Sequence, residues 1–380
     1  MNRKNIGLYY TSGAFWMGGV IYIQNIIRSL DSLPDEEKPN LFIFYNDLAS
    51  PYISEIEYPY INFIKIKFPN LILGYLISII IRKNVFENGI IEKYKLNGLF
   101  PLEHYPIGLG KNNNKVSAWY PDLQHKFYPE YFSKRNLFTR ELRAKFVLRN
   151  AAHLVLSSNN VYSHFKQHYN IRKDLKIHIL RFTSIIDVSK LPSFELISEK
   201  YSISEPYFIV SNQFWKHKDH LTVFKAIHLL KKRNITCKFI FTGNMEDKRD
   251  CGYIDGLKKY IIESNISDYT CFVGLLKREE QLCLMKNSLA VVQPSLFEGW
   301  STVIEDAKAL GCQVIASDLP VHLEQLEDGD KGFLFKAGDS ENLCEIVEKF
   351  VKKEVHFKPV FDNYKQLTID FARELSRLFD

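Results

Sequence analysis

Short apolar runs alternate with helix-length segments from one end of the chain to the other, and this alternation restricts the fold more than any other feature. Strands separated by helices are typical of βαβ units with parallel sheets. One set of expected strands covers residues 6–10, 40–45, 62–68, 116–120 and 153–157. A second set covers residues 207–211, 238–242, 270–273, 290–294 and 313–317. We therefore predict an α/β protein with two nucleotide-binding-type sheets.

The length of 380 residues also favours two domains, because one ordinary α/β unit is shorter. We expect an N-terminal domain over 1–182, a linker over 183–205 and a second domain over 206–355. Leucine and phenylalanine recur at helical spacing near the end, so 356–380 is expected to be a helical segment. Two such sheets would face a cleft, with ligands outside the carboxyl ends of their strands.

Composition excludes several classes of protein. A composition of 46% hydrophobic and 25% charged residues is typical of a folded enzyme. Its six cysteines form no Cys-x-x-Cys pair and have no histidine at zinc-ligand spacing, so they are expected to be reduced thiols and no metal site is expected. A net charge of +6 is too small to indicate nucleic acid but suits anionic substrates or a bilayer surface. No apolar run of signal-peptide length opens the chain, so we expect a cytoplasmic protein.

Two segments raise the question of membrane contact. Residues 71–81 form an apolar run of eleven residues, against the roughly 20 that a spanning helix needs, and a buried helix is favoured over a membrane contact. Residues 134–149 contain six Lys or Arg against one Glu, with Leu137, Phe138, Leu142 and Phe146 interleaved. This pattern fits either a solvated helix face or contact with an anionic bilayer or a lipid-diphosphate acceptor.

The most informative segment for chemistry is 291–311, where a buried strand gives way to a short loop and then to a helix beginning near Ser301 or Thr302. Free N–H groups at a helix start suit an anion or sugar hydroxyls. Carboxylates at Glu298 and Glu305 bracket this loop, and a carboxylate can accept two hydrogen bonds from vicinal hydroxyls. The alternative for Glu305 is structural, because Thr302 to Glu305 has a capping-box sequence.

A second segment places Lys216 and Lys218 in the loop between the strand 207–211 and the next helix. Cations at a helix start stabilise negative charge that develops on a leaving group without a metal. The alternative is an ordinary solvated loop.

These residues together resemble the family 4 retaining glycosyltransferases of glycosyltransferase group 1, which have two facing Rossmann-like domains (the GT-B fold). The resemblance is strong over residues 207–324 and rests on a Glu-Gly-aromatic loop, a second Glu on the following helix, and the strand at 312–318. It implies that Glu298 holds the donor sugar, Glu305 the nucleotide ribose and Lys218 the diphosphate. This chain has six residues between the two glutamates where the family has seven, and Gln213 stands where the family has Arg.

The resemblance extends to three further places. Gly18 and Gly19 match a glycine pair that lets the backbone approach the donor or acceptor, although a turn alone also explains them. Loops near Asn244 and Leu275 match the base side of the nucleotide site. The family often has a His before the Asp at position 122; here His125 or His104 would substitute, unless these histidines are structural.

The implied catalytic residues are Lys218, Glu298 and His125. The implied donor-binding residues are Gly18, Gly19, Gln213, Lys218, Asn244, Leu275, Glu298, Gly299, Trp300, Ser301, Thr302 and Glu305.

The resemblance predicts a hexosyltransferase of polysaccharide biosynthesis that moves a sugar from a UDP or GDP sugar to a glycan or lipid-linked acceptor, with retention and with neither metal nor cofactor. The N-terminal domain would lie on the acceptor side, and the protein would be cytoplasmic, with possible peripheral contact at the inner face of an anionic membrane. The alternatives are a nucleotide-sugar epimerase or hydrolase of the same fold, and a sugar-binding scaffold without activity.

Overall fold

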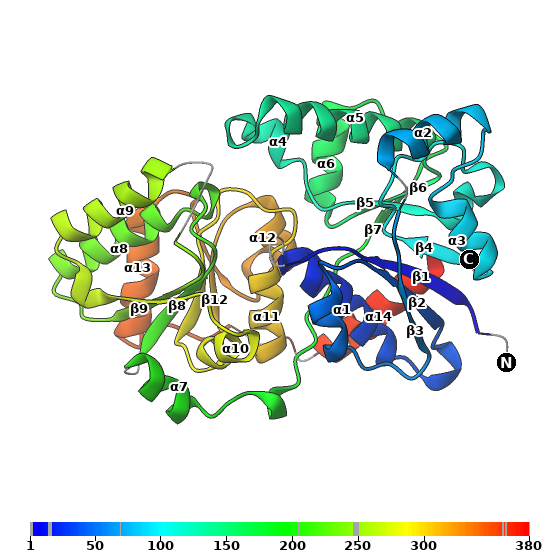
Figure 1. Ribbon diagram of the computed structural model, residues 1–380. Helices are drawn as coiled ribbons and strands as arrows, with labels where there is room; N and C mark the ends of the chain where they lie inside the picture. The colour runs from blue at the N-terminus through cyan, green and yellow to red at the C-terminus, as the bar shows by residue number, and fades with distance from the viewer. Residues whose placement is uncertain are drawn as a thin grey trace. The chain divides into compact units, whose positions relative to one another are not determined.

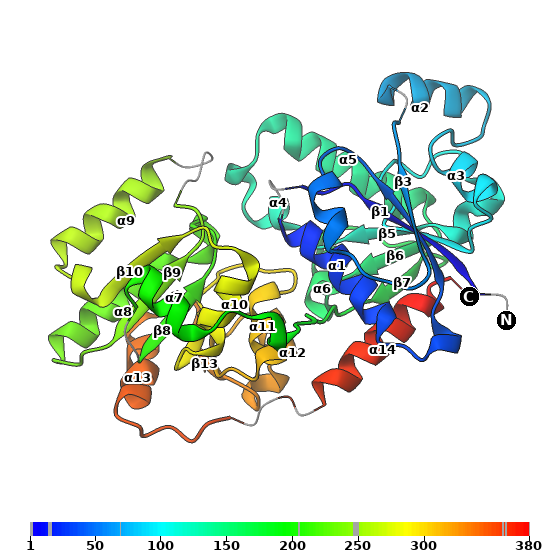
Figure 2. The same cartoon turned by 60° about the horizontal axis from the view of Figure 1, so that its bottom comes forward.

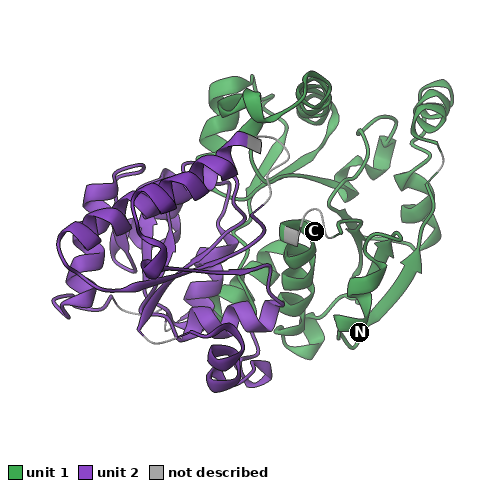
Figure 3. Cartoon of the chain, turned by 60° about the vertical axis from the view of Figure 1, so that its left-hand side comes forward, with its two compact units in different colours: residues 1–185, 365–380 green, residues 186–364 purple. Residues whose placement is uncertain are grey.

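The computed structural model divides the chain into two compact units, one of residues 1–185 with 365–380 and one of residues 186–364 (Figure 3). It describes residues 3–13, 17–68, 70–203, 206–245, 251–358, 361 and 363–379, with backbone alone at Met17 and Cys251. Both units are built from parallel sheets and helices (Figure 1). The predicted fold class, two Rossmann-like domains, is confirmed.

The first unit contains a four-stranded sheet in the order β3-β2-β1-β4 and a three-stranded sheet in the order β5-β6-β7. All strand pairs are parallel, and one parallel bridge between Leu99 and Val116 joins the two sheets. The strands are β1 (Asn5–Tyr10), β2 (Asn40–Tyr45), β3 (Ile61–Lys65), β4 (Gly98–Phe100), β5 (Ser117–Tyr120), β6 (His153–Leu156) and β7 (Lys176–Ile179). The helices are α1 (Met17–Asp31), α2 (Leu71–Ile80), α3 (Glu87–Lys93), α4 (Gln124–Phe127), α5 (Lys134–Asn150), α6 (Asn159–His168) and α14 (Tyr364–Arg377).

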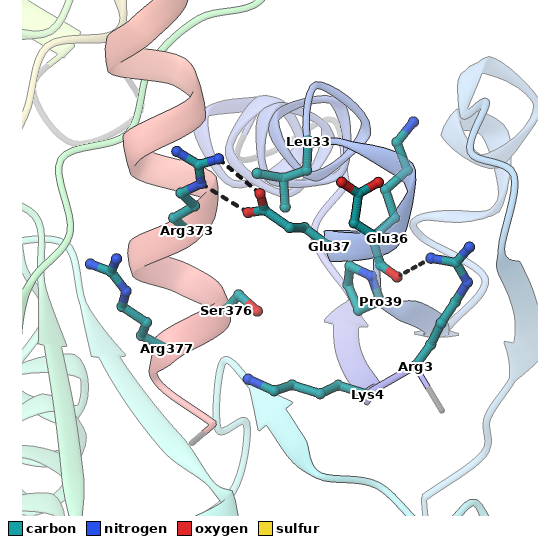
Figure 4. Close-up of a pocket in the computed structure, with 10 residues that line it drawn as sticks. Arg3, Lys4, Leu33, Glu36, Glu37, Pro39, Arg373, Ser376 and Arg377 are labelled. Carbon is teal, nitrogen blue, oxygen red and sulfur yellow. Dashed lines mark hydrogen bonds and ion pairs between the residues drawn. The ribbon is translucent and has the colours of Figure 1, made fainter. Parts of the chain in front are cut away.

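The last helix, α14, returns to the first unit and runs beside α1 (Figures 1 and 2). Phe371 and Leu375 are buried, and the Phe379 ring lies so close to Gly98 that a Cβ there would be 1.9 Å from a ring carbon. Arg373 donates two hydrogen bonds of 2.8 Å to the Glu37 carboxylate. This pair borders a cavity of about 370 Å³, also lined by Arg3, Lys4, Lys38 and Arg377 among others (Figure 4).

The second unit is one six-stranded parallel sheet in the order β10-β9-β8-β11-β12-β13. This is the doubly wound order, in which the first and fourth strands of the unit are neighbours. The strands are β8 (Tyr207–Ser211), β9 (Lys238–Thr242), β10 (Thr270–Gly274), β11 (Ala290–Gln293), β12 (Val314–Ser317) and β13 (Phe333–Phe335). The helices are α7 (Phe194–Tyr201), α8 (His220–Lys232), α9 (Cys251–Glu263), α10 (Arg278–Lys286), α11 (Thr302–Leu310), α12 (Pro320–Gln325) and α13 (Ser340–Val351).

Helices cover both faces of this sheet. Phe208 and Phe239 of the sheet face a core built with α8, α9 and α13, whereas Ile209 and Ile240 face a core built with α7, α10 and α11. Every residue of β8 is therefore buried, as a central parallel strand requires.

The expected strands all form, within a few residues of their predicted limits, while β4, β7 and β13 were not predicted. Residues 183–205, the expected linker, contain a 3₁₀ turn at Val188–Lys190 and helix α7, which contacts α10. One expectation is wrong: residues 71–81 are not a buried helix. Only Gly74 and Ser78 of α2 are buried, Tyr75 is partly buried, and every Leu and Ile of the helix is exposed. No helix within the described ranges is long and apolar enough to cross a bilayer.

Candidate active site

The second unit has a topological switch point between β8 and β11. These central strands are neighbours, and their connections run to opposite sides of the sheet. In open α/β sheets a ligand binds at this point, outside the carboxyl ends of the strands. The loops that follow β8 and β11 contain Lys218 and Glu298, so both predicted residues lie at the expected edge.

Lys218 and Glu298 form an ion pair there. The Lys218 Nζ atom is 2.5 Å from Oε1 of Glu298, with 14% of the lysine side chain and 10% of the glutamate side chain exposed. Oε1 also accepts hydrogen bonds from Gln293 Nε2 and Ser295 Oγ, each at 2.8 Å. Burial alone would raise the pKa of Glu298, but the charge and hydrogen bond of Lys218 outweigh it and hold this pKa below its ordinary 4.5. Glu298 is therefore an anion at neutral pH.

Further hydrogen bonds hold the two loops against each other. The buried side chain of Asn212 donates to Gln293 Oε1 at 2.8 Å, and the Leu296 N–H donates to the His217 carbonyl at 2.8 Å. Ser317, at the end of β12, donates its hydroxyl to the Ser295 carbonyl at 2.6 Å. The ends of β8, β11 and β12 are thus joined by one polar network, which fixes the ion pair in place.

Sequence reasoning missed His322, which belongs to the same network. It lies on α12, is fully buried, and donates from Nδ1 to the Ser317 carbonyl at 2.9 Å in the tautomer that this contact favours. Its Nε2 has no hydrogen-bond partner among the described residues. Burial lowers the pKa of His322 to about 4, so its imidazole is neutral at pH 7. The sequence signal was a histidine four residues beyond Asp318, just past a predicted strand.

The loops after β9 and β10, which the family resemblance assigns to the base side, are also neighbours. The Gly243 N–H donates to the Gly274 carbonyl at 2.8 Å, and Leu275 is exposed. Gln213 accepts a hydrogen bond of 2.9 Å from the Asn244 N–H, so the residue in the place of the family's Arg holds this loop to the end of β8.

The capping-box alternative for Glu305 is wrong, because Thr302 is not the N-cap of helix α11. The cap is Ser301, whose Oγ accepts from the Ile304 N–H at 3.4 Å, and Thr302 is the first helical residue. Gln325 bonds both backbone groups of Ser301, at 2.9 and 3.0 Å, while Glu305 makes other contacts. The buried Gly299 and Trp300 lead into this cap.

Glu305 points into the interior of the second unit and is not exposed. Its Oε1 accepts hydrogen bonds from Lys308 at 2.9 Å and Gln325 at 3.0 Å, and its Oε2 accepts one from the Tyr364 hydroxyl at 3.0 Å. The ribose contact implied by the family resemblance stays a prediction, and a ribose hydroxyl would compete with Tyr364 for Oε2.

The remaining predicted residues belong to the first unit. Gly18 and Gly19 lie in the first turn of α1, where Gly18 is exposed and Gly19 buried. His125 is buried on α4, and neither ring nitrogen has a hydrogen-bond partner among the described residues; burial lowers its pKa to about 4. His104 is bonded through Nδ1 to the buried Glu87 at 2.7 Å and stacks on Phe86, which is a structural arrangement.

Within the described residues, no group of three or more His, Cys, Asp or Glu side chains is placed to hold a metal ion. Free thiols are found at Cys237, Cys271, Cys283, Cys312 and Cys344.

Comparison with known proteins points to one class. Residues 193–367 match the family described as glycosyl transferases group 1. The chain is 23% identical over 296 residues to the O-antigen chain mannosyltransferase RfbU of Salmonella typhimurium, covering 75% of this chain and 76% of that protein. It is 22% identical over 197 residues to the capsular polysaccharide biosynthesis glycosyltransferase CapM of Staphylococcus aureus, covering 49% of this chain and 48% of CapM.

Solved structures share the fold. Anabaena HepE in complex with UDP and glucose superposes with a TM-score of 0.70 at 15% identity, covering 98% of each chain. The UDP-GlcNAc 2-epimerase of Methanocaldococcus jannaschii superposes with a TM-score of 0.56 at 14% identity, covering 98% of this chain and 99% of that one.

Two Rossmann-like units and the likeness to these solved structures give the chain the GT-B fold. The match of residues 193–367 to glycosyl transferases group 1, together with the likeness to RfbU and CapM, identifies the protein as a glycosyltransferase.

Proposed function

We propose that the protein transfers a hexose from a UDP or GDP sugar to a hydroxyl of a glycan or lipid-linked acceptor, with retention of configuration and without a metal. The observation that carries the proposal is the Lys218–Glu298 pair at the switch point between β8 and β11. The names of RfbU and CapM, and the UDP and glucose in the HepE complex, support this choice of substrates.

In this proposal the ion pair is the resting state of the donor site. A diphosphate is a stronger partner for an ammonium group than a single carboxylate, so Lys218 would turn from Glu298 to the diphosphate when the donor binds. The described hydrogen bonds to Glu298 all end on Oε1, which leaves Oε2 for the hydroxyls of the donor sugar.

The reaction breaks the bond between the anomeric carbon and the diphosphate oxygen and forms a bond from that carbon to the acceptor oxygen. Negative charge develops on the diphosphate, where Lys218 and the start of α11 at Gly299 to Thr302 would stabilise it. A diphosphate oxygen takes the acceptor's proton. His125 stays a predicted catalytic residue, and its lowered pKa keeps its imidazole neutral at pH 7. Gln213, Asn244 and Leu275 would line the base side.

The experiment is a panel of UDP and GDP sugars incubated with the full chain, with release of UDP or GDP followed over time. We expect slow hydrolysis of one donor by the parent and by Lys232→Ala, an exposed lysine of α8, and very little by Lys218→Ala. Faster turnover on adding a glycan acceptor, with the anomeric signal of the product in the donor's configuration, would support retention. Failure to bind UDP or GDP in calorimetry would overturn the proposal.

A nucleotide-sugar epimerase is the second candidate, because an epimerase shares the fold. An epimerase would isomerise the sugar of the nucleotide sugar without an acceptor, and it would not release UDP or GDP as the product of a transfer. The same panel, analysed for isomerised nucleotide sugar, separates the two. A scaffold protein would neither turn over nor need to bind the donor.

A further inference from the structure

Helix α2 presents an aliphatic face to its surroundings. Ile72 and Ile80 are 73% and 78% exposed. The other exposed members of this face, including the residue after the helix, are Leu71, Leu73, Leu76, Ile77, Ile79 and Ile81. A surface helix of a soluble protein normally turns its polar side outward, so α2 has the reverse arrangement.

This orientation is fixed by the narrow inner side of the helix. Gly74 packs so closely on Phe86 that a Cβ there would be 2.3 Å from the ring. Ser78 accepts a hydrogen bond of 3.1 Å from the Val85 N–H, and the Tyr75 hydroxyl accepts one of 3.0 Å from the Tyr105 N–H. Because only small or hydrogen-bonded residues fit this side, the aliphatic residues have no room to turn inward.

Basic residues flank helix α2 on both sides in the sequence. Residues 65–83 contain Lys65, Lys67, Arg82 and Lys83 and no Asp or Glu. Lys65 and Lys83 make exposed ion pairs with Asp47 and Glu92, which contribute little and are weakened by salt.

Helix α5 packs near α2 through its C-terminal half and carries further positive charge at its other end. Tyr105 contacts Tyr75 of α2 at 5.3 Å between ring centroids and Phe146 of α5 at 5.1 Å, so both helices pack on it. The first turns of α5 expose Lys134, Arg135 and Phe138.

We propose that the first unit docks on a bilayer containing anionic phospholipids by laying the aliphatic face of α2 in the interface. A contiguous exposed apolar patch marks an interaction site. A helix of ten residues is about 15 Å long and cannot span the bilayer, but it can lie in the interface plane while basic residues contact headgroups. The face consists of Leu and Ile alone, whereas protein interfaces favour aromatic residues and Arg. Lipid is therefore the better occupant, and this inference does not depend on the proposed transfer reaction.

The test is flotation of the full chain with vesicles of phosphatidylcholine alone or mixed with phosphatidylglycerol. The variant Ile72→Gln/Leu76→Gln/Ile80→Gln changes three exposed residues along one side of α2 and keeps helix propensity. Its control, Leu196→Gln/Ile262→Gln, changes exposed aliphatic residues of α7 and α9 in the second unit. We expect the parent and the control to float with phosphatidylglycerol vesicles and the α2 variant to partition about tenfold less or weaker still.

Lys134→Gln/Arg135→Gln adds a second readout, since it should weaken flotation with phosphatidylglycerol vesicles at low salt and have less effect at high salt. Circular dichroism of every variant checks that the fold is kept. The inference is overturned if the folded parent does not float with phosphatidylglycerol vesicles or if the α2 variant floats as well as the parent. It is equally overturned if sedimentation velocity shows a dimer that the α2 variant dissociates while vesicle binding is absent.

Discussion

At the scale of a residue, Lys218 is expected to change its partner when the donor binds. Its partner in the structure is Glu298, and in the proposed reaction its partner is the diphosphate. We expect Lys218→Ala to lower kcat by about 10²- to 10³-fold, the usual effect of removing one donor to a developing negative charge. Binding of UMP or GMP should weaken far less, because Lys218 acts on the diphosphate. Single-turnover kinetics and calorimetry measure the two effects, and parental kcat in this variant would remove Lys218 from the mechanism.

His322 gives a prediction for pH. Its pKa is about 4 in the folded protein and 6.5 as its ordinary value, so the unfolded chain binds more protons between these limits. The stability due to neutral His322 is therefore complete above pH 6.5 and is lost as the pH falls toward 4. His322→Asn keeps a donor for the Ser317 carbonyl and should reduce the loss of unfolding free energy over this range by about 3 kcal/mol. Urea titrations at several pH values measure it, and an unchanged pH slope would contradict the assignment.

The family resemblance assigns Glu305 to the nucleotide ribose, whereas in the structure its carboxylate contacts Lys308, Gln325 and Tyr364. It forms a buried ion pair with Lys308, and removing one partner of such a pair costs roughly 3–5 kcal/mol. We expect Glu305→Gln to lower the unfolding free energy by an amount of this order and, through loss of the predicted ribose contact, to weaken UDP or GDP binding by the folded protein. Tyr364→Phe, which frees Oε2 for a ribose hydroxyl, is the companion variant and should bind UDP more strongly. Parental UDP affinity in both variants would remove Glu305 from the ribose site.

At the scale of elements, the sequence predicted strands well and exposure poorly. Central parallel strands such as β8 are continuous apolar runs, and such runs are readable without a structure. Strands β4 and β13 have three residues each, too few to show a pattern. Helix α2 was misjudged because an apolar run usually indicates burial; here Gly74 and Ser78 provide the packing surface, and hydropathy does not reveal which side of a helix packs.

The site was predictable in part for a related reason. Lys218 and Glu298 follow strand ends, and the doubly wound order brings those ends together. His322 and Gln325 lie on a six-residue helix that carries no motif. Their roles depend on hydrogen bonds to Ser317 and Ser301, which only the packed structure specifies.

At the scale of the whole molecule, the first unit is completed by the end of the chain. Helix α14 starts in the second unit at Tyr364 and belongs to the first unit from residue 365 onward. The chain therefore passes between the two units twice. Phe371 is 2% exposed, and replacing a buried Phe by Ala typically costs about 3–5 kcal/mol.

We therefore expect Phe371→Ala to lower the unfolding temperature of the first unit and to leave that of the second nearly unchanged. Arg373→Ala, which breaks the exposed pair with Glu37, should have a small effect that disappears at high salt, because exposed pairs are screened. Hydrogen exchange resolved by peptide reports each unit separately: protection should fall in β1 and α1 but persist in β8 and β11. Equal loss of protection in both units would mean that they unfold as one cooperative body and that α14 stabilises the whole chain.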